Sequence, residues 1–199
     1  MILFFISFFL EKYKEIGFID KKRHNLTFFF VIFYLKGGFL MDNYEINSET
    51  LVIVPFDKGK SKVYEYDGEY IINTNALNII KNSCLFFGCS FEGRKDAVKN
   101  ILGVDMKVPI LIEDSKNIIF FPITSCINKN SIWISYQNLL KFSKNDEFST
   151  VLYFRNNKKI LVDVKYNLVD NQIIRCIKLD SLISKRKNFI KCEEILLEE

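Results

Sequence analysis

The segment from Gly88 to Lys95 has the most distinctive possible chemistry in the chain, because its sequence GCSFEGRK nearly matches a phosphate-binding loop. That loop has the pattern GxxxxGK[ST], in which the lysine reaches the β and γ phosphates of a nucleotide and the hydroxyl group holds magnesium. Here Arg94 takes the lysine position, Lys95 takes the hydroxyl position, and Glu92 would bring a negative charge into the loop. A buried strand should also precede such a loop, whereas the residues before Gly88 have a helical pattern. Nucleotide binding is therefore not the favoured interpretation.

Residues for catalysis or metal binding are scarce elsewhere in the chain. The single histidine is His24, so a Ser-His-Asp or Cys-His arrangement cannot form within residues 41–199. Cys84 and Cys89 have no second pair at matching spacing, which favours buried free thiols over a zinc site. The five cysteines are an odd number without paired spacing, and this favours a reducing cytoplasm over a disulfide framework. We expect no catalytic residues, no metal and no cofactor.

Basic side chains form three clusters that could contact the phosphates of a nucleic acid. The first cluster follows the glycines and has two lysines at positions i and i+4, on one face of a helix. The second lies at the tip of a predicted hairpin, and the third follows the last predicted helix. Any single cluster is also typical of a solvated surface. The predicted DNA-contacting residues are Arg94, Lys95, Lys99, Lys158, Lys159, Lys185, Arg186 and Lys187.

Arginine is scarce in residues 41–199, where it occurs at Arg94, Arg155, Arg175 and Arg186. Arginine is the side chain that most often reads guanine, through two parallel hydrogen bonds. A DNA partner is therefore expected to be AT-rich and to be read partly through the shape of its grooves.

The first 40 residues differ from the rest of the chain in composition, since they hold half of its 20 phenylalanines. Their two apolar runs, 2–10 and 26–35, are each about half the length of a membrane span. No basic start and no small-residue cleavage site of a secretory signal is present. Three interpretations stay open: upstream sequence before a true start at Met41, which we favour, a membrane or interfacial anchor, or folded structure. This segment supplies +3 of the formal charge of +4, so the overall pI is no evidence for a nucleic-acid partner.

The elements expected in residues 41–199 come in blocks. Strand patterns occupy 51–55, 62–66 and 69–73, with an Asp67-Gly68 hairpin turn between the last two. Further strands are predicted over 108–112, 118–121, 132–136, 151–154 and 160–166. Strands in blocks, interrupted by helices rather than alternating with them, predict a single α+β domain with largely antiparallel sheet and two or three helices.

Helices are predicted from apolar spacing and from capping residues. One runs from Leu77 to a left-handed cap at Gly88, and a second starts after Ser90 and ends at Gly103. A last helix is predicted from the cap residue Asn167 through about 183. Its inward side chains are expected to be Ile173, Ile174 and Ile177, and the predicted core includes Phe86, Phe87 and Trp133.

The segment around the two glycines also has a second pattern, Ser-Cys-x-Phe-Phe-Gly followed shortly by Gly-Arg-Lys. Its residues here are Ser83, Cys84, Phe86, Phe87, Gly88, Gly93, Arg94 and Lys95. Downstream, the segments KVPI at 107–110, FPITS at 121–125 and WIS at 133–135 follow in order. Over residues 44–183 the chain thereby resembles the ComK family, the competence transcription factors of Gram-positive bacteria. Residues 1–40 and the short acidic end after Lys191 depart from the family pattern.

The resemblance implies a cytoplasmic activator that binds AT-rich double-stranded promoter DNA as a homo-oligomer and acts on RNA polymerase indirectly. It would switch on genes for DNA uptake and transformation, its own included. It implies no enzyme, and no membrane for residues 41–199. The resemblance assigns no DNA contacts, so the predicted contact residues depend on charge alone. The alternatives are a protein–protein interaction module, or a decayed competence paralogue without DNA binding, and more distantly a nucleotide-hydrolysing enzyme.

Overall fold

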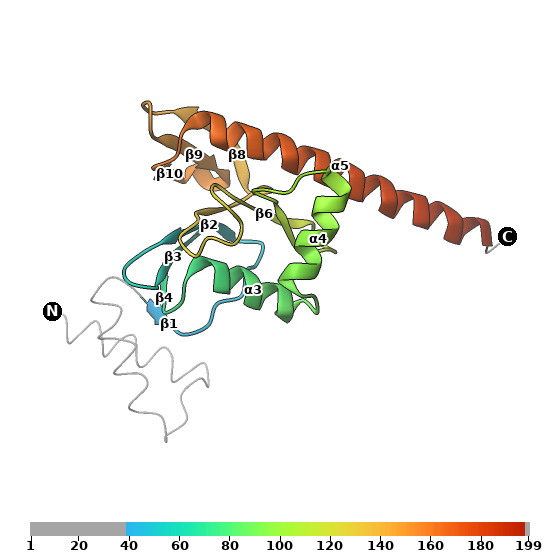
Figure 1. The fold of residues 1–199 in the computed structure, drawn as a ribbon, viewed down its shortest axis with the longest axis horizontal. Coiled ribbons are helices and arrows are strands. Elements are labelled where there is room, and N and C mark those ends of the chain that lie inside the picture. Colours follow the sequence, from blue (N-terminus) through green and yellow to red (C-terminus); the bar gives the residue numbers. More distant parts are fainter. Residues whose placement is uncertain (1–38, 198–199) are drawn as a thin grey trace, which may run out of the picture. The chain divides into compact units, whose positions relative to one another are not determined.

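The computed structural model of the chain describes residues 39–197, and it describes the side chains of residues 41–189 except Asn156. Residues 1–38, and with them the predictions for the leader, lie outside this range. Within it the chain forms three helices and two antiparallel sheets, as the α+β prediction required (Figure 1). None of the described helices is long and apolar enough to cross a membrane.

The larger sheet has seven strands in the order β1-β4-β3-β2-β7-β6-β5. The predicted turn at Asp67-Gly68 joins β3 to β4, and the Glu65 N–H donates to the Gly68 carbonyl oxygen (3.0 Å). Strand β6 is buried at every position, since it lies between β5 and β7 and also contacts a helix. The seven strands are β1 (Phe39–Met41), β2 (Thr50–Pro55), β3 (Ser61–Glu65), β4 (Glu69–Ile72), β5 (Ile110–Glu113), β6 (Ile118–Pro122) and β7 (Trp133–Ser135).

Helices α3 (Ala76–Phe86) and α4 (Phe91–Leu102) are joined by the glycine-containing segment, and their predicted caps are confirmed. Gly88 has φ +78 and Gly103 has φ +66, so both adopt the left-handed conformation that ends a helix. The Ser90 Oγ accepts a hydrogen bond from the Gly93 N–H (3.0 Å) and caps α4.

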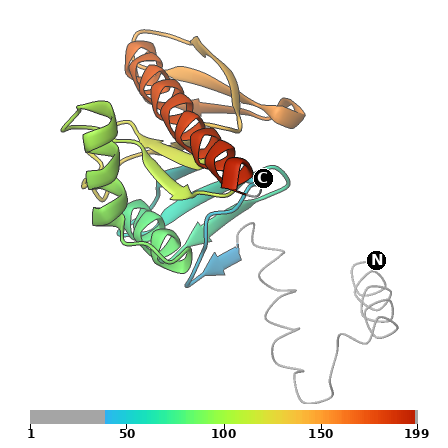
Figure 2. The same ribbon diagram turned by 90° about the vertical axis from the view of Figure 1, so that its right-hand side faces the viewer.

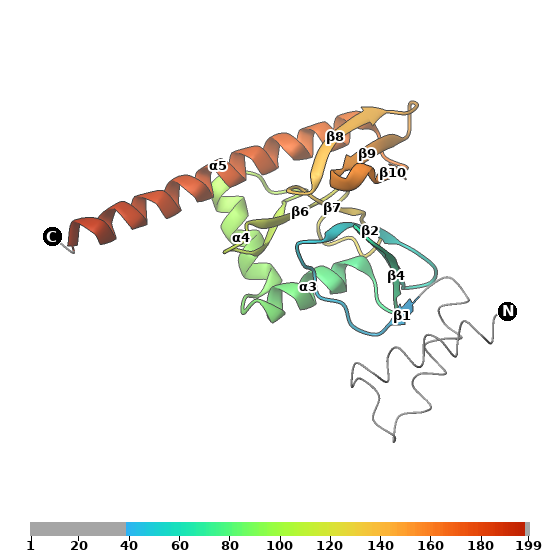
Figure 3. The ribbon, with the colours of Figure 1, turned by 180° about the vertical axis from the view of Figure 1, so that it is seen from behind.

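The smaller sheet has the strand order β10-β9-β8 and is seen best from behind (Figure 3). It consists of β8 (Leu139–Lys144), β9 (Thr150–Phe154) and β10 (Lys159–Val162), and the short helix η1 (Arg155–Asn157) connects the last two. Strand β8 was not predicted, because its buried and exposed positions do not alternate and it carries a bulge between Leu139 and Lys141. Asn157 has φ +63, a left-handed conformation that asparagine tolerates, at the turn between β9 and β10.

Helix α5 (Tyr166–Leu197) has 32 residues, so the predicted end near 183 is wrong. No glycine or proline lies within it to stop the helix. The helix starts at Tyr166, which places Asn167 in the first turn instead of at the cap. It runs between α4 and the smaller sheet and contacts α4, β6 and β8 (Figures 1 and 2).

The face of α5 that is buried differs from the predicted one. Ile174 and Ile177 were expected to point inward and are instead 57% and 52% exposed, while Ile173 is half-buried. The buried side chains of this helix recur every three or four residues on the face next to the predicted one. They are Val169, Gln172, Cys176, Leu179 and Ile183.

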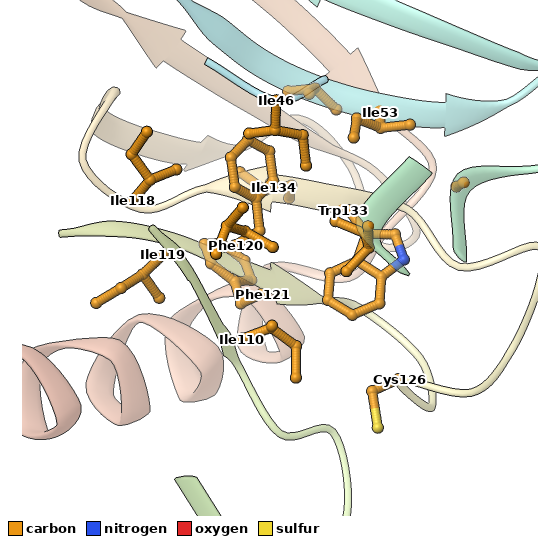
Figure 4. Close-up of a cluster of buried hydrophobic side chains, with 14 of the residues drawn as sticks. Ile46, Ile53, Ile110, Ile118, Ile119, Phe120, Phe121, Cys126, Trp133 and Ile134 are labelled. Carbon is orange, nitrogen blue, oxygen red and sulfur yellow. The ribbon is translucent and has the colours of Figure 1, made fainter. Parts of the chain in front are cut away.

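The core lies around the central strands of the larger sheet, where Phe120, Phe121 and Trp133 are fully buried (Figure 4). Each large side chain removed from water stabilises the fold by about 1.5–3 kcal/mol. The prediction of Trp133 as core is therefore confirmed. The prediction of Phe86 as core is wrong, since this side chain is 67% exposed at the end of α3; Phe87 is half-buried against the core.

Candidate nucleic-acid interface

The glycine-containing segment has the geometry of a helix–helix corner. It joins α3 to α4, whereas a nucleotide-binding loop follows a strand. The first N–H groups of α4 are already used, since Gly93 N–H donates to Ser90 and Glu92 lies in the first turn. Lys81 lies 3.2 Å from Glu92, and a backbone N–H together with that ammonium holds the pKa of Glu92 below its ordinary value. A carboxylate thus stands where a nucleotide phosphate would bind.

The thiols of this region are also unsuited to catalysis. Burial raises the pKa of the Cys84 thiol to about 12, so this thiol is not a nucleophile near neutral pH. The four cysteines that the structure describes are free, and three of them are buried. Among the described residues no group of three or more His, Cys, Asp or Glu side chains could hold a metal ion.

The first predicted basic cluster lies on α4 and is partly engaged within the fold. Arg94 is half-buried, and its Nε has no hydrogen-bond partner among the described residues. The Lys95 ammonium lies 5.6 Å from the centre of the Phe91 ring, a cation–π contact. The Lys99 ammonium lies 3.8 Å from a carboxylate oxygen of the exposed Asp105.

The second predicted cluster, at the start of β10, contains two lysines with different surroundings. Lys158 is half-buried, and its ammonium donates to the backbone carbonyl oxygens of Glu65 (2.6 Å) and Gly68 (3.2 Å) in the β3–β4 hairpin. It thereby fastens the smaller sheet to the larger one. Lys159 is exposed on β10, where the burial pattern puts it on the outer face.

The third predicted cluster lies inside α5 and does not follow it, which corrects the sequence prediction. The Lys187 ammonium lies 2.9 Å from a carboxylate oxygen of Asp114 and 2.7 Å from the side-chain oxygen of Asn117, both in the β5–β6 turn. Lys185 and Arg186 are exposed, and within the described residues neither has an ion pair.

The structure does not bring the three clusters together at one place. Lys185 to Lys187 lie some twenty positions along α5 from its start, a distance of roughly 30 Å in a straight helix. Lys158 and Lys159 lie on the smaller sheet, beside the start of the same helix (Figure 3). A single compact site therefore cannot contain all eight predicted residues.

A further basic surface, which the sequence reasoning missed, lies on the outer face of the smaller sheet. Lys141, Tyr153 and Lys159 are neighbours in register across β8, β9 and β10. The Lys141 ammonium lies 4.9 Å from the centre of the Tyr153 ring, and the Lys159 ammonium lies 5.5 Å from it. The Tyr153 hydroxyl is 3.2 Å from the Ser143 Oγ. We call Lys141, Tyr153 and Lys159 the lysine–tyrosine row.

The row was missed because β8 was not predicted, so Lys141 had no known neighbour. The alternation of buried and exposed positions in β9 could have identified Tyr153. Because Leu152 and Phe154 are buried, Tyr153 lies on the opposite face of the strand.

More positive charge lies where β8 ends and α5 begins. Lys144 and Lys165 line a hollow of about 420 Å³ together with Glu147, Tyr166 and Asn167. Of the neighbouring acids, Asp146 is held in the β8–β9 turn by the Ser149 hydroxyl (2.6 Å) and the Phe148 N–H (2.8 Å). These hydrogen bonds hold the pKa of Asp146 below its ordinary value.

Comparison with known proteins identifies the family to which the chain belongs. The family model described as ComK protein matches residues 41–188. A competence transcription factor of Bacillus subtilis (strain 168) is 30% identical over 161 residues, which cover 75% of this chain and 84% of that protein. No solved structure matches the chain. Because the family match spans well over half of the chain, and includes both sheets and the α3–α4 corner, the chain belongs to the ComK family, a family of competence transcription regulators.

Proposed function

We propose that this protein is a DNA-binding activator of competence genes, which acts in the cytoplasm as a homo-oligomer on AT-rich promoter DNA. The observation that carries the proposal is the family match over residues 41–188, because it includes every basic cluster described above. The Bacillus subtilis relative is a competence transcription factor, which agrees with that role. Under the proposal RNA polymerase is affected indirectly, through promoter occupancy.

The proposed phosphate contacts include the predicted residues whose charges point to solvent. Lys159, Lys185 and Arg186 are exposed, and among the described residues none of them has an ion pair to exchange for phosphate. The other five predicted residues remain proposed contacts: Arg94, Lys95, Lys99, Lys158 and Lys187. Those that have protein partners, as described above, would have to exchange these partners for phosphate.

The arginine distribution supports the preference for AT-rich DNA. The Arg175 guanidinium donates to the backbone carbonyl oxygens of Met106 (2.6 Å) and Lys107 (3.2 Å), and so serves the fold. Arg94 is half-buried, which leaves Arg155 and Arg186 as the exposed arginines of the described residues. Guanine recognition in the major groove depends largely on such arginines.

The experiment is a fluorescence-anisotropy titration of the full chain against AT-rich and GC-rich duplexes of equal length, at two salt concentrations. We expect tighter binding to the AT-rich duplex and a steep loss of affinity with salt, because phosphate contacts release counterions. Equal, salt-insensitive or absent binding to both duplexes would contradict the proposal.

A second candidate function is a protein–protein interaction module without DNA binding. One observation favours it: Leu85 and Phe86 are 64% and 67% exposed side by side at the end of α3. Charge reversal at Lys159, Lys185 and Arg186 separates the two functions. A regulator that needs DNA loses competence-gene activation, and an interaction module behaves as the wild type does.

A further inference from the structure

We propose that the lysine–tyrosine row is the centre of the DNA-contacting surface, with Lys141 and Lys159 on phosphates and the Tyr153 hydroxyl donating to a phosphate or sugar oxygen between them. This inference depends on the proposed function and adds to it a face of the fold and two residues, Lys141 and Tyr153, that the charge clusters did not include.

The charges of the row all have one sign. The outer positions of the smaller sheet form two rows in register, and the second consists of Ser143, Val151 and Leu161. None of these six positions carries a carboxylate, although the two lysines share one tyrosine ring. A sheet face whose charges served solubility alone would gain from opposite charges in cross-strand pairs. A face of a single sign instead attracts a polyanion.

The packing of the smaller sheet does not require the two lysine side chains. The inner face of the same sheet supplies the packing, through the fully or almost fully buried Leu152, Phe154, Ile160 and Val162. Lys141 and Lys159 are exposed, and among the described residues neither forms an ion pair. Apart from the cation–π contacts with Tyr153, which lie within the row itself, their charges are therefore available to a ligand.

The hydrogen bonds of Lys158 and the bulge in β8 position the row. Lys158 precedes Lys159 and holds the start of β10 against the β3–β4 hairpin through two carbonyl oxygens. The bulge in β8 brings Lys141 into register with Tyr153. Two independent features thus fix the ends of the row. Lys158 positions β10 and would have to release these carbonyl oxygens to contact phosphate itself, whereas Lys159 needs no such release.

The chemistry of the row favours the duplex backbone over other nucleic-acid targets. Lysine is a compact charge that suits phosphate, and it lacks the rigid planar fork with which arginine recognises a base edge. Tyrosine and serine hydroxyls commonly bond phosphate oxygens and fix the register of a protein on DNA. A single-stranded target would need several aromatic side chains to stack successive bases, and this face offers one. Sheets are an established way of meeting the DNA grooves.

The test compares full-length K141A/K159A with a matched control, K58A/K129A, which removes two exposed lysines from loops outside the smaller sheet. Binding to an AT-rich duplex is measured by anisotropy between about 50 and 200 mM salt. Loss of two phosphate contacts makes the plot of log K against log salt shallower and reduces the magnitude of its slope by about 1.8. At about 0.1 M salt, which is one decade below about 1 M, this loss weakens binding roughly 60-fold. Each phosphate contact contributes about 0.9 to log K per decade of salt. The control retains the wild-type slope.

Two more variants separate contact from structure. K141R/K159R preserves the charges and is expected to retain the slope, and Tyr153→Phe preserves the ring and loses about tenfold in affinity with its hydroxyl. A wild-type slope in K141A/K159A overturns the role of the row and leaves the proposed function standing. Absence of salt-dependent binding by the wild type overturns the proposed function itself. Weakened binding to single strands alone, or equal losses in the control, also refutes the row as a duplex contact.

Discussion

Replacing Gly88 by alanine tests whether the glycine-containing segment is a structural corner or a ligand-binding loop. Gly88 ends α3 with φ +78, a conformation that disfavours every L-residue with a Cβ. An added Cβ would meet no atom within 4 Å, so steric collision contributes nothing. The expected effect is therefore the conformational cost alone, with no loss of a ligand contact.

That cost can be estimated from the backbone conformation. Placing an L-residue in the left-handed region costs about 1–2 kcal/mol. For a domain of this size each kcal/mol lowers the melting temperature by about 2–4 °C, so Gly88→Ala should melt about 2–8 °C below the wild type. The DNA affinity of the folded variant should be unchanged.

A matched control comes from Gly59, which lies between β2 and β3 with φ +75 and likewise has no atom within 4 Å of an added Cβ. Gly59→Ala should therefore lower the melting temperature by a similar amount. Thermal unfolding followed by circular dichroism, with anisotropy on an AT-rich duplex, measures both quantities. If Gly88→Ala kept its melting temperature and lost DNA affinity, the segment would be a binding loop and the corner interpretation would fail.

Three further results follow from the described contacts. Lys187→Ala should lower the free energy of unfolding by about 1 kcal/mol, through lost hydrogen bonds and a partly exposed ion pair, whereas Lys185→Ala should change it by less than about 0.5 kcal/mol in the same urea titration. Trp133→Ala should cost about 3–5 kcal/mol because it empties the core, and Phe86→Ala should stay within about 0.5 kcal/mol; equal losses in urea would contradict the burial assigned to them. The pKa of Cys84 is raised by burial from 9.0 to about 12, so this thiol stabilises the fold below pH 9 and that contribution is lost as pH rises toward 12. Denaturant titrations from neutral to alkaline pH should show this loss, and Cys84→Ser should reduce it.

The sequence could predict those parts of the fold that depend on neighbouring residues. Ser90 caps a helix and Gly88 and Gly103 end helices because the required groups lie within four positions of each other along the chain. Seven of the eight predicted strands also begin and end within two residues of the observed ones. The exception, 160–166, ends early because Tyr166 already belongs to α5.

Other parts depend on contacts that are distant in sequence, and these could not be predicted. Strand β8 lacks alternation because a bulge interrupts its pairing with β9. The burial of Ile174 and Ile177 was assigned to the wrong face of α5, since apolar character alone does not say which side meets α4 and β6. Phe86 is exposed although Cys84, two positions before it, is buried, because α3 ends at Phe86.

The same distinction explains the outcome for the candidate interface. The sequence identifies the charged residues, but a lysine can serve the fold or the surface, and its partner decides which. Lys187 meets Asp114 across 73 positions, and Lys158 meets the carbonyl oxygen of Glu65 across 93. Lys159, next to Lys158, points to solvent. Adjacent charges in one cluster thus have opposite roles, which no count of charge along the chain can separate.

Most of the residues that reveal the family build the α3–α4 corner, and of the proposed DNA contacts only Arg94 and Lys95 belong to the motif. Ser83 is fully buried and its Oγ accepts the Ile46 N–H (2.9 Å), so it anchors α3 to the segment that precedes β2. Gly93 lies beside the capping oxygen of Ser90, where an added Cβ would come within 3.0 Å of it. These positions demand particular residues because their geometry is tight. A phosphate-binding face is different, because a lysine can approach from several neighbouring positions with nearly the same effect. Apart from Arg94 and Lys95, the motif is therefore a poor guide to the proposed DNA contacts, and the lysine–tyrosine row is where those contacts should be sought.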